Sequence, residues 1–274
     1  MLEETRPDGH GRARGLVSSR VSGRRVASRT YAPPGPLREV VDCFWIAEWD
    51  LRGQAPHVVE LLADPCVNVA FERGGSRVVG VSRRLWRREL AGAGRIRAVK
   101  LRAGAARALW PDLVVAHLSD RVVPLHDLVP GDPEGTESEV LGPGDEAEGL
   151  AALAGWLEVR VTLPPEPRVA LAVALVDHIA ADPGMTSVGA LARAAGLGPR
   201  ALQRLFREHV GASPKWVIRR FRLQEAALRL ERGAGVTLAA LAAELGYSDH
   251  AHLTRDFRAA TGRAPSTFAR DVWR

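Results

Sequence analysis

The sequence contains only two cysteines, Cys43 and Cys66, in 274 residues. Two cysteines do not form the disulfide framework of a small secreted protein, so a reducing compartment is favoured. Both adjoin apolar residues, which favours buried structural cysteines over a redox pair. No run of about 18 apolar residues occurs, so no membrane-spanning helix is predicted. No apolar stretch follows the charged N-terminus, so we expect no secretory signal and a cytoplasmic protein.

The short motifs of common enzyme chemistry are also missing. There is no G-x-S-x-G turn, no P-loop, no glycine-rich dinucleotide turn and no HExxH motif. His57 and Glu60 are three residues apart, which on a strand places them on opposite faces, so a metal site is not expected. We therefore predict no catalytic, cofactor-binding or metal-binding residues. An N-terminal enzyme fused to another domain is kept as a remote alternative.

Lysine is scarce, with only Lys100 and Lys215 among 38 basic residues, and the positive charge is unevenly distributed. Residues 168–274 hold 16 Arg and Lys against 9 Asp and Glu, a net charge of +7. Residues 1–167 hold 22 against 23, a net charge of −1. A local basic surplus is what contact with nucleic-acid phosphates requires.

The stretch 197–217, LGPRALQRLFREHVGASPKWV, predicts a short helix. It starts at Pro199, because proline in the first turn loses only an amide that lacks a partner anyway. Apolar residues recur at helical spacing and define a buried stripe. The side away from this stripe carries Arg200, Gln203, Arg204 and Arg207. Gly211 ends the helix, and Ser213 caps the next one. A short helix from Ser187 to Gly196 precedes it, which is the helix-turn-helix arrangement.

The same pattern occurs twice. At an offset of 50 residues, Thr237, Leu241, Ala242 and Gly246 repeat Ser187, Leu191, Ala192 and Gly196. At an offset of 51, Leu253, Phe257, Gly262 and Pro265 repeat Leu202, Phe206, Gly211 and Pro214. The second turn therefore holds one extra residue. The outward positions of the second unit are Ala251, Thr254, Arg255 and Arg258, with His250 at the start of the helix.

These residues make about the last 105 residues resemble the AraC/XylS family of bacterial transcription regulators. In the first unit the resemblance rests on Leu191-Ala192, Gly196, 202–206 (LQRLF), Gly211 and Ser213-Pro214. In the second unit it rests on Leu241-Ala242, Leu245-Gly246-Tyr247, Leu253, Arg255, Phe257, Gly262 and Pro265. It implies two helix-turn-helix units joined by a long helix, DNA binding and regulation of transcription. The family often has serine where this chain has Gly198, and glycine is also a competent N-cap.

We predict that both outward faces contact DNA. Arginine can pair with guanine and glutamine with adenine, whereas alanine and threonine can contact a thymine methyl group. For the arginines the alternative is a solvated helix face. For His250 it is a surface histidine or a phosphate contact. The predicted DNA-binding residues are Arg200, Gln203, Arg204, Arg207, His250, Ala251, Thr254, Arg255 and Arg258.

Residues 31–130 show many short strand candidates between turns. They are 43–49, 57–62, 67–72, 77–81, 84–90, 95–102, 114–118 and 121–125. This predicts a small β-rich barrel or α+β domain. With YxPPxxL, CFW and a DPC turn, the segment also looks like the N-terminal module of one AraC subgroup, which would imply a sensory or dimerising domain. Phe44, Trp45 and Trp49 are expected to pack in its core, the alternative being a ligand pocket.

The predicted fold class is an α+β two-domain protein. We expect a disordered tail over 1–30, a β-rich domain over 31–130, an acidic loop, a helix and a Pro-rich linker over 131–167, and an all-α DNA-binding domain over 168–274. The helix-turn-helix units are predicted at 187–210 and 237–261, joined by a helix over 215–231.

The predicted function is sequence-specific transcription regulation, with double-stranded DNA as the partner at a bipartite operator. A small-molecule effector, RNA polymerase and a second copy of the chain are further candidate partners, and no membrane is expected. The N-terminal domain is interpreted as the effector sensor. The alternative is a domain that only dimerises or binds another protein.

Overall fold

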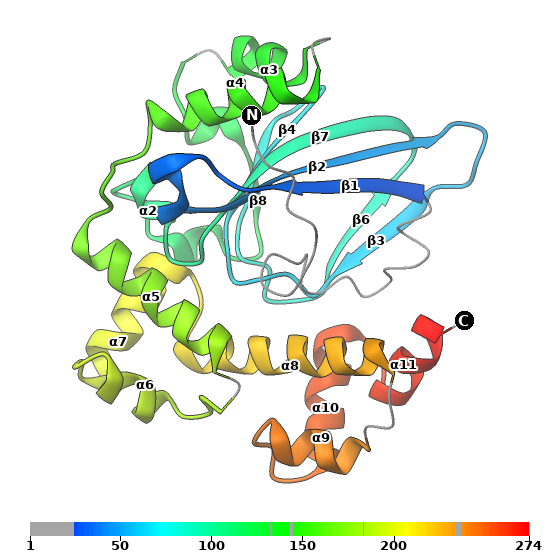
Figure 1. The fold of residues 1–274 in the computed structure, drawn as a ribbon, viewed down its shortest axis with the longest axis vertical. Helices are drawn as coiled ribbons and strands as arrows, with labels where there is room; N and C mark the ends of the chain where they lie inside the picture. The colour runs from blue at the N-terminus through cyan, green and yellow to red at the C-terminus, as the bar shows by residue number, and fades with distance from the viewer. Residues whose placement is uncertain (1–24, 132, 143–144, 183, 234–236, 274) are drawn as a thin grey trace.

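The protein is described by a computed structural model that covers residues 25–131, 133–142, 145–182, 184–233 and 237–273. A β-rich N-terminal region lies above a C-terminal region built of helices (Figure 1). The predicted α+β fold class is confirmed. The first 24 residues of the predicted tail lie outside the described residues.

The N-terminal region is built from antiparallel strands. A six-stranded sheet has the order β1 (Val26–Tyr31), β2 (Val41–Leu51), β7 (Gly92–Leu101), β4 (Asn68–Glu72), β5 (Arg77–Val79) and β8 (Val122–Pro124). A two-stranded sheet pairs β3 (His57–Leu61) with β6 (Trp86–Leu90). The sequence also predicted a strand over 114–118, and this was wrong: Val115–Leu118 forms the 3-10 helix η2. Two further short helices are η1 (Gly35–Glu39) and α2 (Ala106–Leu109).

Buried side chains alternate between the two faces of the central strands and so contribute to two hydrophobic cores. In β2, Phe44 and Ile46 are buried on one face, while Trp49 and Leu51 are buried on the other. Successive side chains on a strand point to opposite faces, so each strand contributes to both cores. The smaller core lies between the two sheets, and the larger one lies under the helices.

Strand β1 corrects the prediction of a disordered tail through residue 30. It pairs with β2 from Val26 opposite Trp49 to Tyr31 opposite Phe44. The segment VASRTY has little apolar periodicity, which is why no strand was predicted. Backbone hydrogen bonds to the edge of β2 hold this segment as a strand. Because these bonds do not depend on the side-chain pattern, the sequence pattern did not predict them.

The acidic segment after residue 131 is also different from the prediction, since it forms helix α3 (Pro133–Leu141) and the start of α4 (Glu146–Glu158) instead of a loop. The Asp145 carboxylate caps α4 by accepting from the Glu148 amide at 2.8 Å. Glu146 accepts from Arg29 Nε at 3.0 Å. Glu137 accepts from Ser76 Oγ at 2.8 Å. Glu137 and Glu146 therefore bind groups of the β-rich region, while Asp145 caps its own helix, and these contacts favour helices over a solvated loop.

The C-terminal region consists of helices, and those of the two helix-turn-helix units and the helix between them begin and end close to the predicted residues. They are α5 (Pro167–Ala181), α6 (Val188–Ala194), α7 (Pro199–Leu205) with the π-helical turn η4 (Phe206–Val210), α8 (Pro214–Arg232), α9 (Leu238–Glu244), α10 (His250–Thr261) and α11 (Pro265–Trp273).

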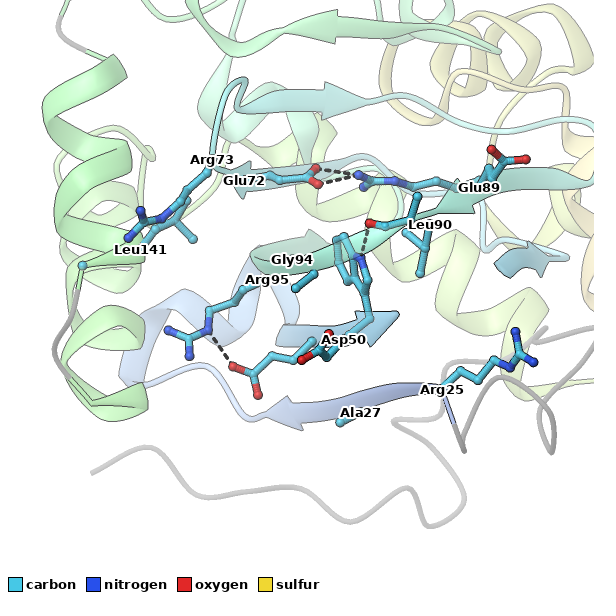
Figure 2. A pocket seen from close by; sticks show the side chains of 16 residues that line it. Arg25, Ala27, Asp50, Glu72, Arg73, Glu89, Leu90, Gly94, Arg95 and Leu141 are labelled. Atoms are coloured by element: carbon cyan, nitrogen blue, oxygen red, sulfur yellow. Dashed lines mark hydrogen bonds and ion pairs between the residues drawn. The ribbon is translucent and has the colours of Figure 1, made fainter. Parts of the chain in front are cut away.

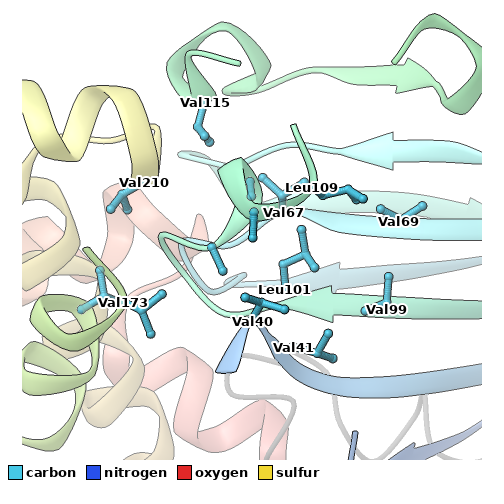
Figure 3. Close-up of a cluster of buried hydrophobic side chains, with 14 of the residues drawn as sticks. Val40, Val41, Val67, Val69, Val99, Leu101, Leu109, Val115, Val173 and Val210 are labelled. Atoms are coloured by element: carbon cyan, nitrogen blue, oxygen red, sulfur yellow. The ribbon is translucent and has the colours of Figure 1, made fainter. Parts of the chain in front are cut away.

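The largest hydrophobic core crosses from the sheet into the helices. Val40 and Leu101 of the N-terminal region belong to the same buried cluster as Val173 of α5 and Val210 of η4 (Figure 3). The 3-10 helix η2 contacts η4 directly. The first helix-turn-helix unit therefore packs on the β-rich region through a continuous apolar core.

Candidate nucleic-acid interface

The first helix-turn-helix unit is built by the local signals that the sequence shows. Ser187 caps α6 by accepting from the Ala190 amide at 3.3 Å. Gly196 adopts φ 61° in the turn, a left-handed conformation that glycine reaches without a steric cost. Leu202 and Phe206 are fully buried beneath α7 and η4. The helix α7 is thereby held with its other face outward.

The outward face formed by α7 and the first turn of η4 carries uncompensated positive charge. Arg200, Gln203, Arg204 and Arg207 are all exposed. Within the part of the chain that the structure describes, none of these three arginines forms an ion pair. A helix face with free guanidinium groups offers donors for phosphates and for base edges.

The second unit has a corresponding outward face on α10, which carries fewer long hydrogen-bonding side chains than the face of the first unit. Asp249, which the sequence analysis did not identify, caps α10 by accepting from the His252 amide at 2.7 Å. This hydrogen bond lowers the pKa of the Asp249 carboxyl. His250, Ala251, Arg255 and Arg258 are exposed, and Thr254 is half-buried. All nine predicted residues thus lie on α7, η4 or α10, and their contact with DNA stays a prediction.

Two charged residues between the units were missed by the sequence analysis. Arg219 of α8 pairs with Asp256 of α10, with the Nε atom 2.7 Å from a carboxylate oxygen. The Arg222 guanidinium lies 3.9 Å from the centre of the Tyr247 ring. The sequence feature that could have identified both residues is the run of arginines inside an apolar helix, RRFR at 219–222. These contacts fix α10 and the second turn against α8.

Helix α8 separates the two units. It has 19 residues, which at 1.5 Å per residue is about 28 Å. Ser213 caps its start by accepting from the Trp216 amide at 3.3 Å. Gly233 ends it with φ 80°. This length is close to one turn of B-DNA, about 34 Å.

A cavity of about 1050 Å³ opens between the two sheets, at the ends of β2, β6 and β7 (Figure 2). Trp49 lines it, with Arg88 5.6 Å from the centre of the indole ring. Arg88 also donates to Glu72 at 2.8 Å, and Arg95 donates to Glu48 at 2.6 Å. Charges of both signs therefore meet in this cavity, and two pairs of them, Arg88 with Glu72 and Arg95 with Glu48, are in direct contact.

The cysteines and the other aromatic residues that the sequence analysis considered as site residues do not line this cavity. Cys43 and Cys66 are buried and unpaired, and burial raises the pKa of each thiol to about 12. Phe44 lies in the larger core, whereas Trp45 donates to Asn68 at 3.2 Å. Over the described ranges, no group of three or more His, Cys, Asp or Glu side chains has the geometry to hold a metal ion.

Comparison with protein families finds two matches. Residues 191–271 match a family described as a helix-turn-helix domain. Residues 29–124 match a family described as a domain of unknown function (DUF6597). The two matches divide the chain between the helices and the β-rich region.

Curated relatives match over part of their length. The chain is 29% identical over 126 residues to the HTH-type transcriptional activator RhaS of Pectobacterium atrosepticum, covering 46% of this chain and 37% of that protein. It is 28% identical over 124 residues to RhaS of Pectobacterium carotovorum, covering 45% and 37%. The chain thus spans less than half the length of these relatives.

Among solved structures, ToxT from Vibrio cholerae is similar over 79% of this chain and 98% of its own, with 10% identity and a TM-score of 0.43. The C-terminal domain of AraT, a response regulator from Geobacillus stearothermophilus, is similar over 38% of this chain and 85% of its own, with 20% identity and a TM-score of 0.35. Of the helices formed by the described residues, none has the length and apolarity that crossing a bilayer requires.

Proposed function

We propose that the chain is a transcription regulator of the AraC/XylS type, which binds a bipartite operator in double-stranded DNA and regulates transcription. The observation that carries the proposal is the doubled helix-turn-helix, with α7 and α10 each turning an arginine-bearing face to solvent. The curated relatives named above are called transcriptional activators, which supports the same class of function.

Helix α7 is proposed to do most of the base reading. Arg200, Gln203, Arg204 and Arg207 are long, exposed side chains with several hydrogen-bond donors. Such side chains can make bidentate contacts with base edges in the major groove. Helix α10 offers Arg255 and Arg258 beside the short side chains of Ala251 and Thr254. It is therefore proposed to contribute mainly phosphate and methyl contacts.

Footprinting of the full chain on its operator tests this proposal. We expect two protected major-groove segments about 10 bp apart on one face of the duplex, because α8 separates the units by nearly one helical turn. A control operator with about 5 bp inserted between the segments places them on opposite faces and should lose one of the two footprints. A single short protected segment on the intact operator would contradict the proposal.

A small-molecule effector bound between the sheets is the second part of the proposed function. The cavity beside Trp49 combines an apolar ring with charged groups of both signs, which could contact a small polar ligand. Arg88 is the residue best placed to hold it. The alternative is an N-terminal region that only dimerises or binds a protein partner.

A thermal-shift screen of sugars, amino acids and organic acids distinguishes an effector-binding N-terminal region from one that only dimerises or binds a protein partner. An effector should raise the melting temperature of the wild type and leave Arg88→Gln unshifted, because ligands stabilise the state that they bind. Arg52→Gln is the matched control, since Arg52 is exposed in the turn after β2 and does not line the cavity. Absence of any stabilising compound, together with a concentration-dependent dimer in sedimentation, would support the alternative.

A further inference from the structure

The β-rich region contacts the second helix-turn-helix unit through a short loop, residues 62–64, which we name the bridging loop. We propose that Leu62 in this loop and Gln224 in α8 are positioning residues, which set the placement of the second unit relative to the first. The inference rests on the proposed function, because it takes α10 to be a DNA-reading helix.

The first observation is the burial of Leu62. It follows β3 and is fully buried, yet it lies in the hydrophobic core of the second unit. That core contains residues of the four helices that meet there, among them Leu223 of α8, Leu241 of α9, Leu253 of α10 and Phe268 of α11. An apolar side chain from the β-rich region thus belongs to the same close-packed core as the buried residues of α10.

The second observation is a buried polar contact at the same place. Gln224 lies in the middle of α8 and is 5% exposed. Its Nε2 atom donates to the Leu62 carbonyl at 2.8 Å and to Asp64 Oδ1 at 2.8 Å. A buried amide that satisfies two acceptors of one loop fixes that loop in direction as well as in distance.

The bridging loop is in turn anchored to the six-stranded sheet. Asp64 pairs with Lys100, which lies on the central strand β7 and also pairs with Asp42 at 2.7 Å. Lys100 is one of the two lysines in the chain; burial alone would lower its pKa, but the carboxylates of Asp64 and Asp42 raise the pKa well above its usual value. The position of the loop therefore follows the position of the sheet.

Two neighbouring contacts support the same attachment. Arg220 of α8 is 3% exposed and donates to the carbonyls of Ser82 and Arg83 at 3.2 and 2.8 Å. Arg263, directly after α10, donates to the buried Glu60 of β3 at 2.9 Å. Helix α8 and the residues that follow α10 are therefore attached to the β-rich region on both sides of the bridging loop.

The first unit is attached elsewhere and by different residues. Ser119 Oγ donates to the Gly211 carbonyl at 2.6 Å, and Val115 packs near Gly211 in the same core. Because each unit has its own attachment, the β-rich region acts with α8 in setting the offset between α7 and α10. Loss of one attachment should affect one half-site, whereas general destabilisation should affect both.

Binding of the full chain to the two half-sites tests the inference. In Leu62→Ala, we expect affinity for the bipartite operator to fall by about tenfold or more, with the footprint lost under the second unit and kept under the first. Leu51→Ala is the matched control, because Leu51 is equally buried but lies in the core between the sheets. It should leave the ratio of the two half-site affinities unchanged.

Gln224→Met keeps the inference testable if Leu62→Ala does not fold. It removes the donor of the two hydrogen bonds and nearly keeps the side-chain volume, so the same half-site-selective loss is expected. Leu62→Met, which restores an apolar side chain of similar size, should rescue the second footprint.

The outcomes separate this inference from the proposed function. If the folded Leu62→Ala and Gln224→Met variants weaken both half-sites equally, or neither, the bridging loop does not position the second unit. If the wild type protects only one segment, the proposed bipartite recognition itself fails.

Discussion

Acidification should weaken the junction between the first helix-turn-helix unit and the β-rich region, through His209. This side chain lies in η4 and is 2% exposed, and η4 contacts η2, α2 and α5. Neither ring nitrogen has a hydrogen-bond partner within the described structure. Burial, and then the charges of Arg107 and Arg168, lower the pKa of His209 to about 4, while Glu208 acts weakly in the opposite direction.

The sign of the effect follows from linkage. The unfolded chain binds a proton at His209 near pH 6.5 and the folded chain only near pH 4, so the folded state is favoured above pH 6.5 and loses stability as the pH falls toward 4. One pKa unit corresponds to about 1.4 kcal/mol. The loss from this residue is therefore about 2 kcal/mol between pH 7 and pH 5, and about 3 kcal/mol by pH 4.

Urea unfolding of the wild type and of His209→Leu at pH 7 and pH 5 measures this loss. Carboxylates titrate in both proteins, so the quantity of interest is the difference between their pH dependences. The wild type should lose about 2 kcal/mol more than the variant. His126→Gln is the control for removing a histidine at the surface, since the His126 side chain is 67% exposed. Equal losses in the wild type and His209→Leu would refute the reasoning.

Three further predictions concern DNA reading and packing. Arg204→Ala should weaken specific binding by about 1–3 kcal/mol at fixed salt, while the distant Arg52→Ala should not; unchanged affinity would show that α7 is assigned the wrong face. Saturation mutagenesis of the operator should find that the half-site under α7 tolerates fewer base changes than the one under α10, and equal information content in both would reject this. Gly80→Ala should cost about 3 kcal/mol, because the added Cβ would lie 1.8 Å from the Leu118 carbonyl oxygen. Gly155→Ala on α4 meets no atom within 4 Å and should be neutral or stabilising, so equal thermal shifts for the two variants would count against the packing described for Gly80.

The helix-turn-helix units could be predicted from the sequence because their signals are local. Capping by Ser187 and Thr237, the left-handed glycines at 196 and 246, and the buried Leu202 and Leu253 act within one or two helical turns of themselves. Local hydrogen bonds and helical periodicity decide these elements before any long-range contact forms. The exposed face of α7 followed from the same periodicity.

The elements that the sequence analysis missed depend on partners far along the chain. The strand over 26–31 exists because β2 offers an edge to it. The acidic helix α3 is held by Ser76, and Arg97 of β7, 2% exposed, donates to the Asp145 carbonyl at the start of α4 at 3.3 Å. Neither the apolar pattern of these segments nor their local charge predicts such long-range contacts.

The relation between the two regions was decided only by tertiary structure. From the sequence alone, Leu62 is the last residue of a strand candidate and His209 one of several polar residues in an amphipathic helix. In the fold, Leu62 fills the core of the second unit and His209 is enclosed at the junction of the first. Burial depends on which surfaces meet, and surfaces that meet across about 100 residues or more are selected by the free energy of the whole core, which no local stretch of sequence contains.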